Sequence, residues 1–574
     1  MSEKGQAPKA KDSSSTSIRL DSDALAIAKD TARGSFVIAN RSLQAGEILL
    51  ECPSASIALD HGYRTSHCGF CATEIQQQQQ QVAQSSTCQG CRVLATCHHC
   101  RETLKDWHAQ SGECAVLQCL VEGFGKVFLS EQVMTAQDVS PHIDPIYIIT
   151  MRLAHRRQLD RHNGTTTQNS TTTILPSIDW NLLDQLYSSP LPANHEGNAV
   201  VSAMAQLLQV MTALWKQKKQ QIPFCNPQEC VSIWNKCRGC CHAITDLTRP
   251  LGAQNLGMAL FLPHSFYNHA CAPNAFLSCM LPSSKQQQHS VCEDPTSTTK
   301  QQQQQHTPAV VARVVCINTI AKGDPVSLSY IPLSGLCRLE RRLRLQETYH
   351  FVCDCSMCSN QEAIERHVGG DFATGKTASD VVTALLPLRE LQIDCYQTLT
   401  LASSMENKDE VMDVVEQCMA TLTMAQRGIR NQQIPASHEV ALECHRLLAV
   451  AHSLLRGDNN HEKDQELHHH REFFGAAEQV EALMDPSALA IQHGLAAQCL
   501  QSKLQDHSDD ATTNEFQKEL LVHRTAAIEI STRAVGGDHP FVHSLQQSMG
   551  GCSETQPTDS ALGTRKRQLS QNGD

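Results

Sequence analysis

The stretch "FYNHACAPNA" (residues 266–275) follows the apolar run "MALFLP" (258–263) and brings an Asn-His pair, a cysteine and a second asparagine into a few positions. A second stretch, "FVCDCSMC" (351–358), helps to explain this unusual set at the edge of a core. Its C-x-C-x2-C spacing supplies three thiolates, which make an incomplete tetrahedral zinc site. We therefore expect one four-cysteine zinc site built from Cys271, Cys353, Cys355 and Cys358. The alternative is a three-cysteine loop that holds no metal.

A denser group of cysteines lies between residues 68 and 114. In a chain with 27 cysteines and no recognisable secretion signal, metal binding explains them better than disulfides do. Three C-x2-C pairs fall within this segment, and each such turn puts two thiolates on one side of a tetrahedral zinc. Together with a histidine they complete two four-ligand sites. The expected cysteine ligands are Cys68, Cys71, Cys88, Cys91, Cys97, Cys100 and Cys114. Scattered buried thiols explain Cys418, Cys444 and "CRGCC" (237–241) well enough.

Length and charge exclude several classes of protein. The 574 residues, 41% hydrophobic and 18% charged, are enough for several domains and at least one large core. A net charge of −12 gives no general attraction to nucleic acid or to acidic membranes. The polar N-terminus has no signal-peptide core, and we see no uninterrupted apolar stretch long enough to span a bilayer. We therefore expect a protein of the cytoplasm, the nucleus or both, without membrane or strong nucleic-acid binding.

Short strands are predicted in two segments, one near the N-terminus and one after residue 310. In "VVARVVCINTIAKGDPVSLSYI" (310–331), β-branched runs flank the turn signal "AKGD", which predicts two antiparallel strands with Tyr330 ending the second. The segment "ARGSFVIANRSLQAGEILLECPSASIAL" (32–59) repeats the pattern, with turns at Gly34 and at Ala45-Gly46. The sheets should be short, and their strands should lie far apart in the sequence.

In this order, the motifs resemble the SET-and-MYND-domain (SMYD) protein-lysine methyltransferases, over roughly residues 31–360. The family signature Asn-His-Ser-Cys-x-Pro-Asn matches 268–274 except that Ala270 replaces the serine. The resemblance implies an α+β fold, in which a β-rich SET domain is interrupted by a MYND-type zinc module and followed by a post-SET zinc loop and an all-α, TPR-like domain. The implied segments are a disordered N-terminus (1–30), the SET N-terminal part (31–67), the MYND-type module (68–114), a helical insert with a low-complexity loop (115–252), the SET core (253–335), the post-SET segment (336–365), the helical domain (366–550) and a disordered tail (551–574).

The resemblance also implies transfer of methyl groups from S-adenosylmethionine to lysine side chains of proteins, with two zinc ions in the MYND module and one in the post-SET loop. Tyr330 corresponds to the family's catalytic tyrosine. The implied cofactor-binding residues are Arg33, Gly34, Asn268, His269 and Phe351. From the residues alone, an asparagine can pair with a zwitterion, a glycine lets the backbone approach a ligand, and an aromatic ring offers adenine a flat face. Each also has an ordinary explanation as a turn cap, a surface charge or a core side chain.

Besides Ala270, the chain departs from the family pattern at two more positions and in the spacing of Cys97 and Cys100, a pair that the family spaces C-x3-C. Gln110 stands where the MYND module carries a histidine, so His108 is the nearest substitute, with His98 and His99 as alternatives. His242 stands where the family has a cofactor-site asparagine, and Asn235 is the nearby candidate to replace it. Tyr267 is a further candidate for a wall of the lysine channel.

The C-terminal region, from about 370 to 550, repeats apolar residues at helical spacing, so we expect an array of helices. The run His468–His470 is interpreted as a solvated loop, and "TRKRQL" (564–569) as a solvated end or a minimal nuclear-import cluster. Glutamine runs at 76–81, 286–288 and 301–305 are expected to loop out. Two functional hypotheses remain: a methyltransferase acting on protein substrates, with possible peptide partners for the MYND module, or a non-catalytic scaffold that recruits partners through the zinc module and helices.

Overall fold

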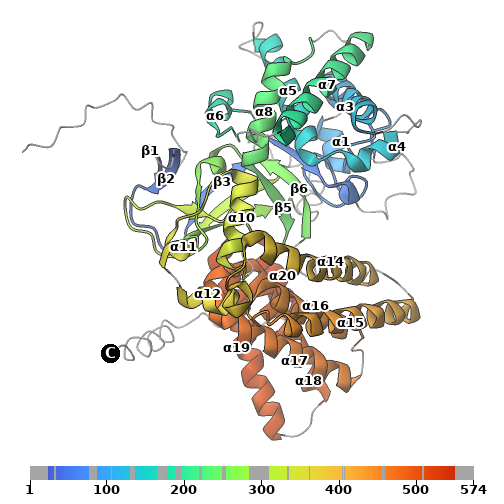
Figure 1. The fold of residues 1–574 in the computed structure, drawn as a ribbon. Coiled ribbons are helices and arrows are strands. Elements are labelled where there is room, and N and C mark those ends of the chain that lie inside the picture. The colour runs from blue at the N-terminus through green and yellow to red at the C-terminus, as the bar shows by residue number, and fades with distance from the viewer. Residues whose placement is uncertain are drawn as a thin grey trace, which may run out of the picture.

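The computed structural model describes residues 23–30, 34–75, 87–104, 107–129, 136–164, 175, 177–188, 195–218, 223–248, 254–282, 309–332, 335–360, 362–403, 405, 407–455, 459–506 and 510–549. The predictions made for Arg33, the glutamine runs and "TRKRQL" lie outside these residues. Within them the chain combines strands and helices. Figure 1 shows the strands in the middle, with helices of the first half above them and helices of the C-terminal region below.

The strands form four small sheets. One two-stranded sheet pairs neighbouring strands antiparallel, and the other pairs two short strands in parallel. Two three-stranded sheets are each assembled around a strand from the middle of the chain. The strands are β1 (Leu25–Asp30), β2 (Gly34–Ala39), β3 (Ile48–Pro53), β4 (Ser56–Leu59), β5 (Cys241–Asp246), β6 (Gln254–Leu260), β7 (Asn268–His269), β8 (Ala275–Met280), β9 (Val311–Cys316) and β10 (Ser327–Leu328). The sheet orders are β1-β2, β3-β9-β8, β4-β6-β5 and β10-β7.

The central strands pair segments that are distant in sequence. β3 pairs antiparallel with β9, with Leu50 opposite Val314, and β8 pairs with the other edge of β9. Val314 and Val315 point to opposite faces of β9 and are both fully buried, because other elements cover both sides of this sheet. The short strands predicted for 32–59 are therefore confirmed, and Gly46, with φ of 85°, occupies the predicted turn.

The prediction of two antiparallel strands within 310–331 is wrong. Its first half is β9, but its second half contains only the two-residue strand β10, which pairs in parallel with β7. Before that point the chain runs beside β2, where Val326 N donates to Val37 O at 2.9 Å. The turn signal was present, but the second half finds its backbone partners in segments that precede it by 50 residues or more. Local spacing carries no information about such partners.

Helices of the first half cover the sheets on the side that faces away from the C-terminal region (Figure 1). They are α1 (His98–Leu104), α2 (Trp107–Gln110), α3 (Glu113–Phe128), α4 (Ala136–Val139), α5 (Pro145–Gly164), α6 (Trp180–Gln185), α7 (His195–Gln217) and α8 (Pro227–Cys240). Among the described residues, one segment of α7, Ala199–Gln217, is long and apolar enough to cross a membrane by length and composition. The sequence reading missed it, but its buried residues Leu207, Leu208 and Met211 belong to the core that α7 shares with α3.

The C-terminal region is an array of helices, as predicted. Its helices are α10 (Arg338–Tyr349), α11 (Ser356–Asn360), α12 (Glu362–Val368), α13 (Gly370–Ala373), α14 (Ala378–Ala402), α15 (Lys408–Asn431), α16 (Glu439–Leu455), α17 (Asn460–Ala477), α18 (Pro486–Asp506), α19 (Asp510–Val535) and α20 (Pro540–Ser548). The interpretation of His468–His470 as a solvated loop is wrong. All three lie inside α17, and His469 and His470 are buried against neighbouring helices.

Arg313 on β9 attaches this helical array to the central sheet. Its guanidinium binds both carboxylate oxygens of Asp538 at 2.6 and 3.0 Å and donates to Val535 O at 3.1 Å, just beyond the end of α19. The same side chain pairs with Glu51 on β3 at 2.7 Å. A bidentate pair from a buried arginine sets orientation as well as energy. The array is therefore docked on the sheet at a defined angle.

Two histidine pairs join helices inside the array. The Nδ1 atoms of His493 and His523, from α18 and α19, lie 2.7 Å apart, and those of His445 and His469 lie 3.2 Å apart. An N–H···N bond of this kind holds one proton, so both rings cannot be charged together. Burial, the largest cause, lowers the pKa of His493 to about 3 and that of His523 to about 4, with Glu519 and Arg471 as the charged neighbours of His523.

We therefore expect the array to lose stability in mild acid. A folded-state pKa below the unfolded value means that only the unfolded rings gain protons as the pH falls below about 6.5. At pH 5 this costs about 2 kcal/mol of unfolding free energy per ring. Denaturant titrations followed by circular dichroism measure the free energy of unfolding. Between pH 7 and pH 5, this free energy should fall by several kcal/mol less in the double variant His493→Leu/His523→Leu than in the parent. His461→Leu, an exposed position in α17, should behave like the parent; equal losses in all three proteins would contradict the prediction.

Candidate functional site

The stretch that opened the sequence reading crosses the segment ending in Tyr330. Asn268 and His269 form β7, which runs parallel to β10, and Ala270 N donates to Leu328 O at 3.0 Å. Asn274 locks the crossing, since its Oδ1 accepts from Ser327 N at 2.8 Å and its Nδ2 donates to the carbonyl of Pro325 at 2.9 Å. The structure thus brings together two segments that the sequence reading linked only through family resemblance. Asn274 has a structural role in this crossing.

A four-cysteine cluster lies directly beside the crossing. The Sγ atoms of Cys271, Cys353, Cys355 and Cys358 all lie within 4.8 Å of one another. Cys271 Sγ is 3.5 Å from Cys358 Sγ and 3.9 Å from Cys353 Sγ. Four thiolates around a tetrahedral zinc with Zn–S bonds of about 2.3 Å are separated by about 3.8 Å, so the donor set fits zinc. A bound ion would tie the loop at 353–358 to the end of β7.

His269 connects this cluster to Tyr330. Its Nδ1 accepts from the backbone N–H of Tyr330 at 3.0 Å, which leaves the proton on Nε2, 3.3 Å from Cys271 Sγ. Its ring lies 5.5 Å from the ring of Tyr330 and 6.0 Å from that of Phe351. Both ring nitrogens are therefore used within the protein. This favours a positioning role for His269 over the direct cofactor contact that the resemblance implies.

Tyr330 has its hydroxyl group oriented by the backbone. The hydroxyl donates to the carbonyl oxygen of Tyr267 at 2.6 Å, at the residue just before Asn268. The ring of Tyr349 lies 4.8 Å away, and its hydroxyl donates to Tyr330 O at 3.1 Å. Burial raises the pKa of Tyr330 above its usual range, so the side chain stays a neutral phenol near pH 7. Sequence reasoning did not assign Tyr349; its place two residues before Phe351 was the signal that could have found it.

Buried polar atoms without described partners gather next to these tyrosines. Among the residues that the structure describes, neither ring nitrogen of His264 has a hydrogen-bond partner, and the same holds for the hydroxyl of Tyr267 and for Nε2 of His242. The rings of His264 and Tyr267 lie 6.1 Å apart. Burial lowers the pKa of His264 to about 3 and that of His242 to about 4, so both rings are neutral at pH 7. Unpaired buried donors and acceptors are costly, and a polar ligand or ordered water next to them would satisfy them.

The remaining cofactor residues of the sequence reading are placed only in part. Gly34 begins β2 with φ of 69°, and a side chain at this position would meet nothing within 4 Å. β2 runs beside the segment that leads to β10, whereas Arg33 lies outside the described residues. Asn235, the alternative to His242, lies on α8, and its buried Oδ1 has no described partner.

Two further clusters occupy the segment between residues 68 and 114. The first consists of Cys68, Cys71, Cys97 and Cys100, and the second of Cys88, Cys91, His108 and Cys114; in each, the donor atoms lie within 4.8 Å of one another. His108 Nε2 is 3.5 Å from Cys91 Sγ, while His98 and His99 lie on α1 and belong to neither cluster. A Cβ on Gly90 would lie 2.6 Å from Cys114 Sγ, so the turn between Cys88 and Cys91 needs a glycine. Both donor sets fit tetrahedral zinc.

Polar partners behind the second cluster hold His108 in place. His108 Nδ1 lies 2.6 Å from Glu113 Oε2, and the other oxygen of Glu113 accepts from Arg152 Nε at 2.8 Å. Burial alone would raise the pKa of Glu113, but the charges of Arg152 and His108 lower it to about 2. A carboxylate of this kind fixes the tautomer and orientation of a metal-binding histidine. The sequence offered no sign of Glu113 or Arg152, because both act through contacts made only in the fold.

Some known proteins resemble this chain over part of its length. A scan against models of known protein families finds no match. N-lysine methyltransferase SMYD2 of Mus musculus is 22% identical over 334 residues, which cover 58% of this chain and 59% of that protein. SMYD2 of Homo sapiens is 21% identical over the same shares, and SMYD2-B of Xenopus laevis is 21% identical over 365 residues, 61% of this chain and 65% of its own.

The chain is a distant relative of these N-lysine methyltransferases. The match spans about three fifths of the length of the relatives. Their names describe transfer of a methyl group to the nitrogen of lysine.

Proposed function

We propose that the chain is a protein-lysine N-methyltransferase that uses S-adenosylmethionine. The observation that carries the proposal is the group formed around β7, where the hydroxyl of Tyr330 is directed at the backbone next to Asn268. The rings of Tyr349, His269 and Phe351 lie 4.8, 5.5 and 6.3 Å from the ring of Tyr330. The distant relationship to N-lysine methyltransferases supports the same chemistry.

In this proposal each residue has a separate task. Bound S-adenosylmethionine supplies a methyl group on a sulfonium centre. Asn268 binds the polar part of the cofactor and Phe351 packs on its flat ring, while the cluster at Cys271 holds both residues in place. The aromatic surroundings of Tyr330 desolvate the ammonium of an incoming lysine, which lowers its pKa and favours the neutral amine. The Tyr330 hydroxyl, held by the carbonyl of Tyr267, orients that amine.

The proposal is tested by titrating the zinc-loaded protein with S-adenosylmethionine in a calorimeter. We expect saturable binding that Asn268→Ala weakens about tenfold or more, because a buried amide contact to a charged ligand is lost. Asn407→Ala, which removes a helix cap in α15, serves as the control and should leave binding unchanged. Tyr330→Phe should retain cofactor binding and lose methyl transfer to lysine-containing protein substrates, measured with a labelled methyl group.

Absence of binding in a folded, zinc-loaded protein would overturn the enzyme proposal. The scaffold hypothesis would then account for the same fold, because the zinc-capable clusters and helices offer surfaces for partners without catalysis. The substrate, in the enzyme proposal, is a protein with an accessible lysine, and the segment 68–114 is the candidate to bind additional peptides. We place this activity in the cytoplasm, the nucleus or both.

A further inference from the structure

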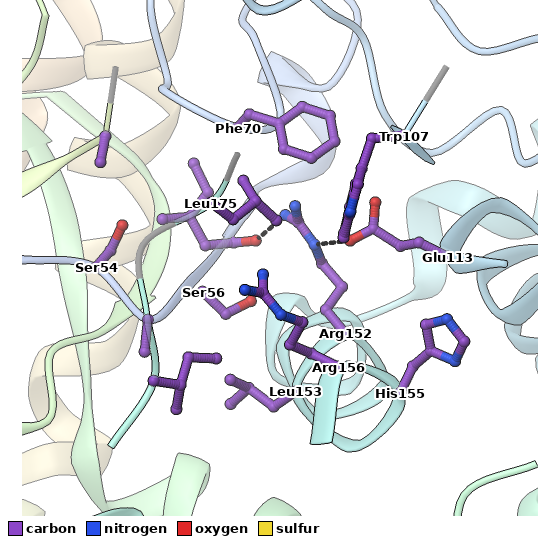
Figure 2. A pocket seen from close by; sticks show the side chains of 14 residues that line it. Ser54, Ser56, Phe70, Trp107, Glu113, Arg152, Leu153, His155, Arg156 and Leu175 are labelled. Carbon is purple, nitrogen blue, oxygen red and sulfur yellow. Dashed lines mark hydrogen bonds and ion pairs between the residues drawn. The ribbon is translucent and has the colours of Figure 1, made fainter. Parts of the chain in front are cut away.

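A hollow lies away from Tyr330, where the cysteine-rich segment meets the sheet and α5. Its walls come from the β3–β4 turn, from Phe70, Trp107 and Glu113 of the cysteine-rich segment and from α5 (Figure 2). It contains about 610 Å³ of empty space, much of it at an open mouth. The residues that matter for its chemistry are Ser56, Phe70, Trp107, Arg152, Leu153 and Arg156. None of these was singled out for the methyltransferase site.

Arg152 forms one wall, and its Nε and Nη1 are bound by the protein. Its Nε donates to Glu113, and its Nη1 donates to the carbonyls of Ile57 at 2.7 Å and Gly69 at 2.9 Å. Its guanidinium also lies 4.8 Å from the centre of the Phe70 ring. Arg152 therefore joins the cysteine-rich segment to the sheet, and it gives the hollow a fixed positive wall.

Two other side chains of the hollow have polar atoms without hydrogen-bond partners among the described residues. The Nε of Arg156 binds Asp160 Oδ1 at 3.2 Å and its guanidinium lies 5.9 Å from the centre of the Trp107 ring, but its two Nη atoms have no hydrogen-bond partner among the described residues. The hydroxyl of Ser56 is buried and also has no partner there. In Figure 2 both groups point toward the middle of the hollow. Two donors that converge without a partner are suited to an oxygen acceptor, and an unpaired buried hydroxyl is costly.

The charges and apolar surfaces define the ligand. Two guanidinium groups line the hollow; Glu113 pairs with Arg152 and Asp160 pairs with Arg156, so the positive charge open to a ligand lies at the free Nη edge of Arg156. The neighbouring imidazole of His155 adds none near pH 7, because burial lowers its pKa. Trp107, Leu153 and Ile178 supply the apolar remainder of the wall. A planar carboxylate matches the free edge of a guanidinium, and a flat apolar body matches the indole.

We propose that this hollow binds a small organic acid, whose carboxylate is held by Arg156 and Ser56 and whose flat apolar body lies against Trp107 and Leu153. The site is separate from the methyl-transfer site and does not depend on the proposed activity. Occupancy would be felt at the second zinc-capable cluster, because Arg152, Glu113 and His108 form one chain of contacts from the wall of the hollow to that cluster.

The test compares two probes that differ only in charge, 2-naphthoate and 2-naphthalenemethanol, on the zinc-loaded full chain. Binding is followed by calorimetry and by tryptophan fluorescence. We expect the acid to bind at least about tenfold more tightly than the alcohol, because only the acid pairs with a guanidinium. Arg156→Met should remove that preference, and Ser56→Ala should lower the affinity for the acid several-fold. The matched control is Arg157→Met, one position along α5, whose guanidinium pairs with Asp184 and Glu229.

Three outcomes would overturn the proposal. They are equal binding of acid and alcohol, an equal effect of Arg156→Met and Arg157→Met, and no binding of the acid up to about 10 mM. Zinc content and circular dichroism establish that each variant is folded. If Arg156→Met does not fold, Arg156→Lys replaces it. The lysine keeps the charge but lacks the planar guanidinium, so Arg156→Lys should lower the affinity for the acid less than a neutral residue would and more than the control does.

Discussion

Cys358→Ala should leave the protein with two zinc ions instead of three and should unfold the region around Tyr330. Cys358 is buried and shares a cluster with Cys271, Cys353 and Cys355. Removal of one thiolate leaves three ligands for an ion whose structural sites are four-coordinate. Structural zinc in small modules contributes about 10–16 kcal/mol of apparent binding free energy, so loss of this ion should be among the largest single effects available.

The measurement is the zinc content per chain by mass spectrometry, together with thermal unfolding. Cys444→Ala is the control, because Cys444 is equally buried but lies outside the clusters. It should keep all three ions and lose only the packing of one sulfur atom and its weak hydrogen bond to Leu422 O. Cys358→Ala should also abolish S-adenosylmethionine binding, since the cluster holds the end of β7 that carries Asn268. Retention of three ions in Cys358→Ala would show that the third ion does not depend on Cys358, and two ions in the parent would show that the cluster at Cys271 is a group of free thiols.

Glu340→Gln should destabilise the junction between α10, α14 and α16 by about 3 kcal/mol. The substitution removes the negative charge of a buried carboxylate and leaves its buried partners without an opposite charge. Glu340 is completely buried. One of its oxygens lies 2.8 Å from His438 Nε2, and the other pairs with Arg389. Its side chain also accepts from the backbone N–H of Cys337 at 3.2 Å and so caps α10. Glutamine keeps the shape of this side chain, so the loss reports the charge.

The pH dependence of this effect has a defined sign. Burial alone would raise the pKa of Glu340, but the hydrogen bond and charge of His438 and the charge of Arg389 hold it well below the ordinary 4.5. A depressed folded-state pKa contributes stability that is complete above the unfolded value and is lost as the pH falls below it. The difference between parent and Glu340→Gln should therefore be constant from pH 7 to about pH 5 and shrink below about pH 4.5.

Denaturant unfolding at several pH values measures this difference. Glu443→Gln is the matched control on α16, because Glu443 forms a half-exposed pair with Arg446 and should cost less than about 1 kcal/mol. A cost for Glu340→Gln no larger than that of the control would show that the buried network contributes little net stability, as is known for some buried ion pairs.

The sequence allowed the zinc-capable donor sets to be predicted closely, and the strand pairing only in part. Each C-x2-C pair is a local turn, so spacing alone indicates that Cys68 and Cys71 face the same ion. The partner of such a pair is not local: the structure combines 68–71 with 97–100 and leaves 88–91 to His108 and Cys114. Likewise, β-branched runs located β9, but the parallel pairing of β10 with β7 could not be derived from them.

The sequence by itself determined the features that depend on neighbours a few residues apart: the cysteine turns, the short strands of 34–59, the helices of the C-terminal array and the absence of general attraction to acidic polymers. The tertiary structure alone decided which distant groups meet. In the fold, the Tyr330 hydroxyl donates a hydrogen bond to the carbonyl of Tyr267, and His469 and His470 are buried between packed helices. Arg156 and Ser56 line the same hollow. The physical reason is that local spacing fixes backbone periodicity, whereas contacts between distant segments depend on how whole elements pack and on which buried polar groups find partners.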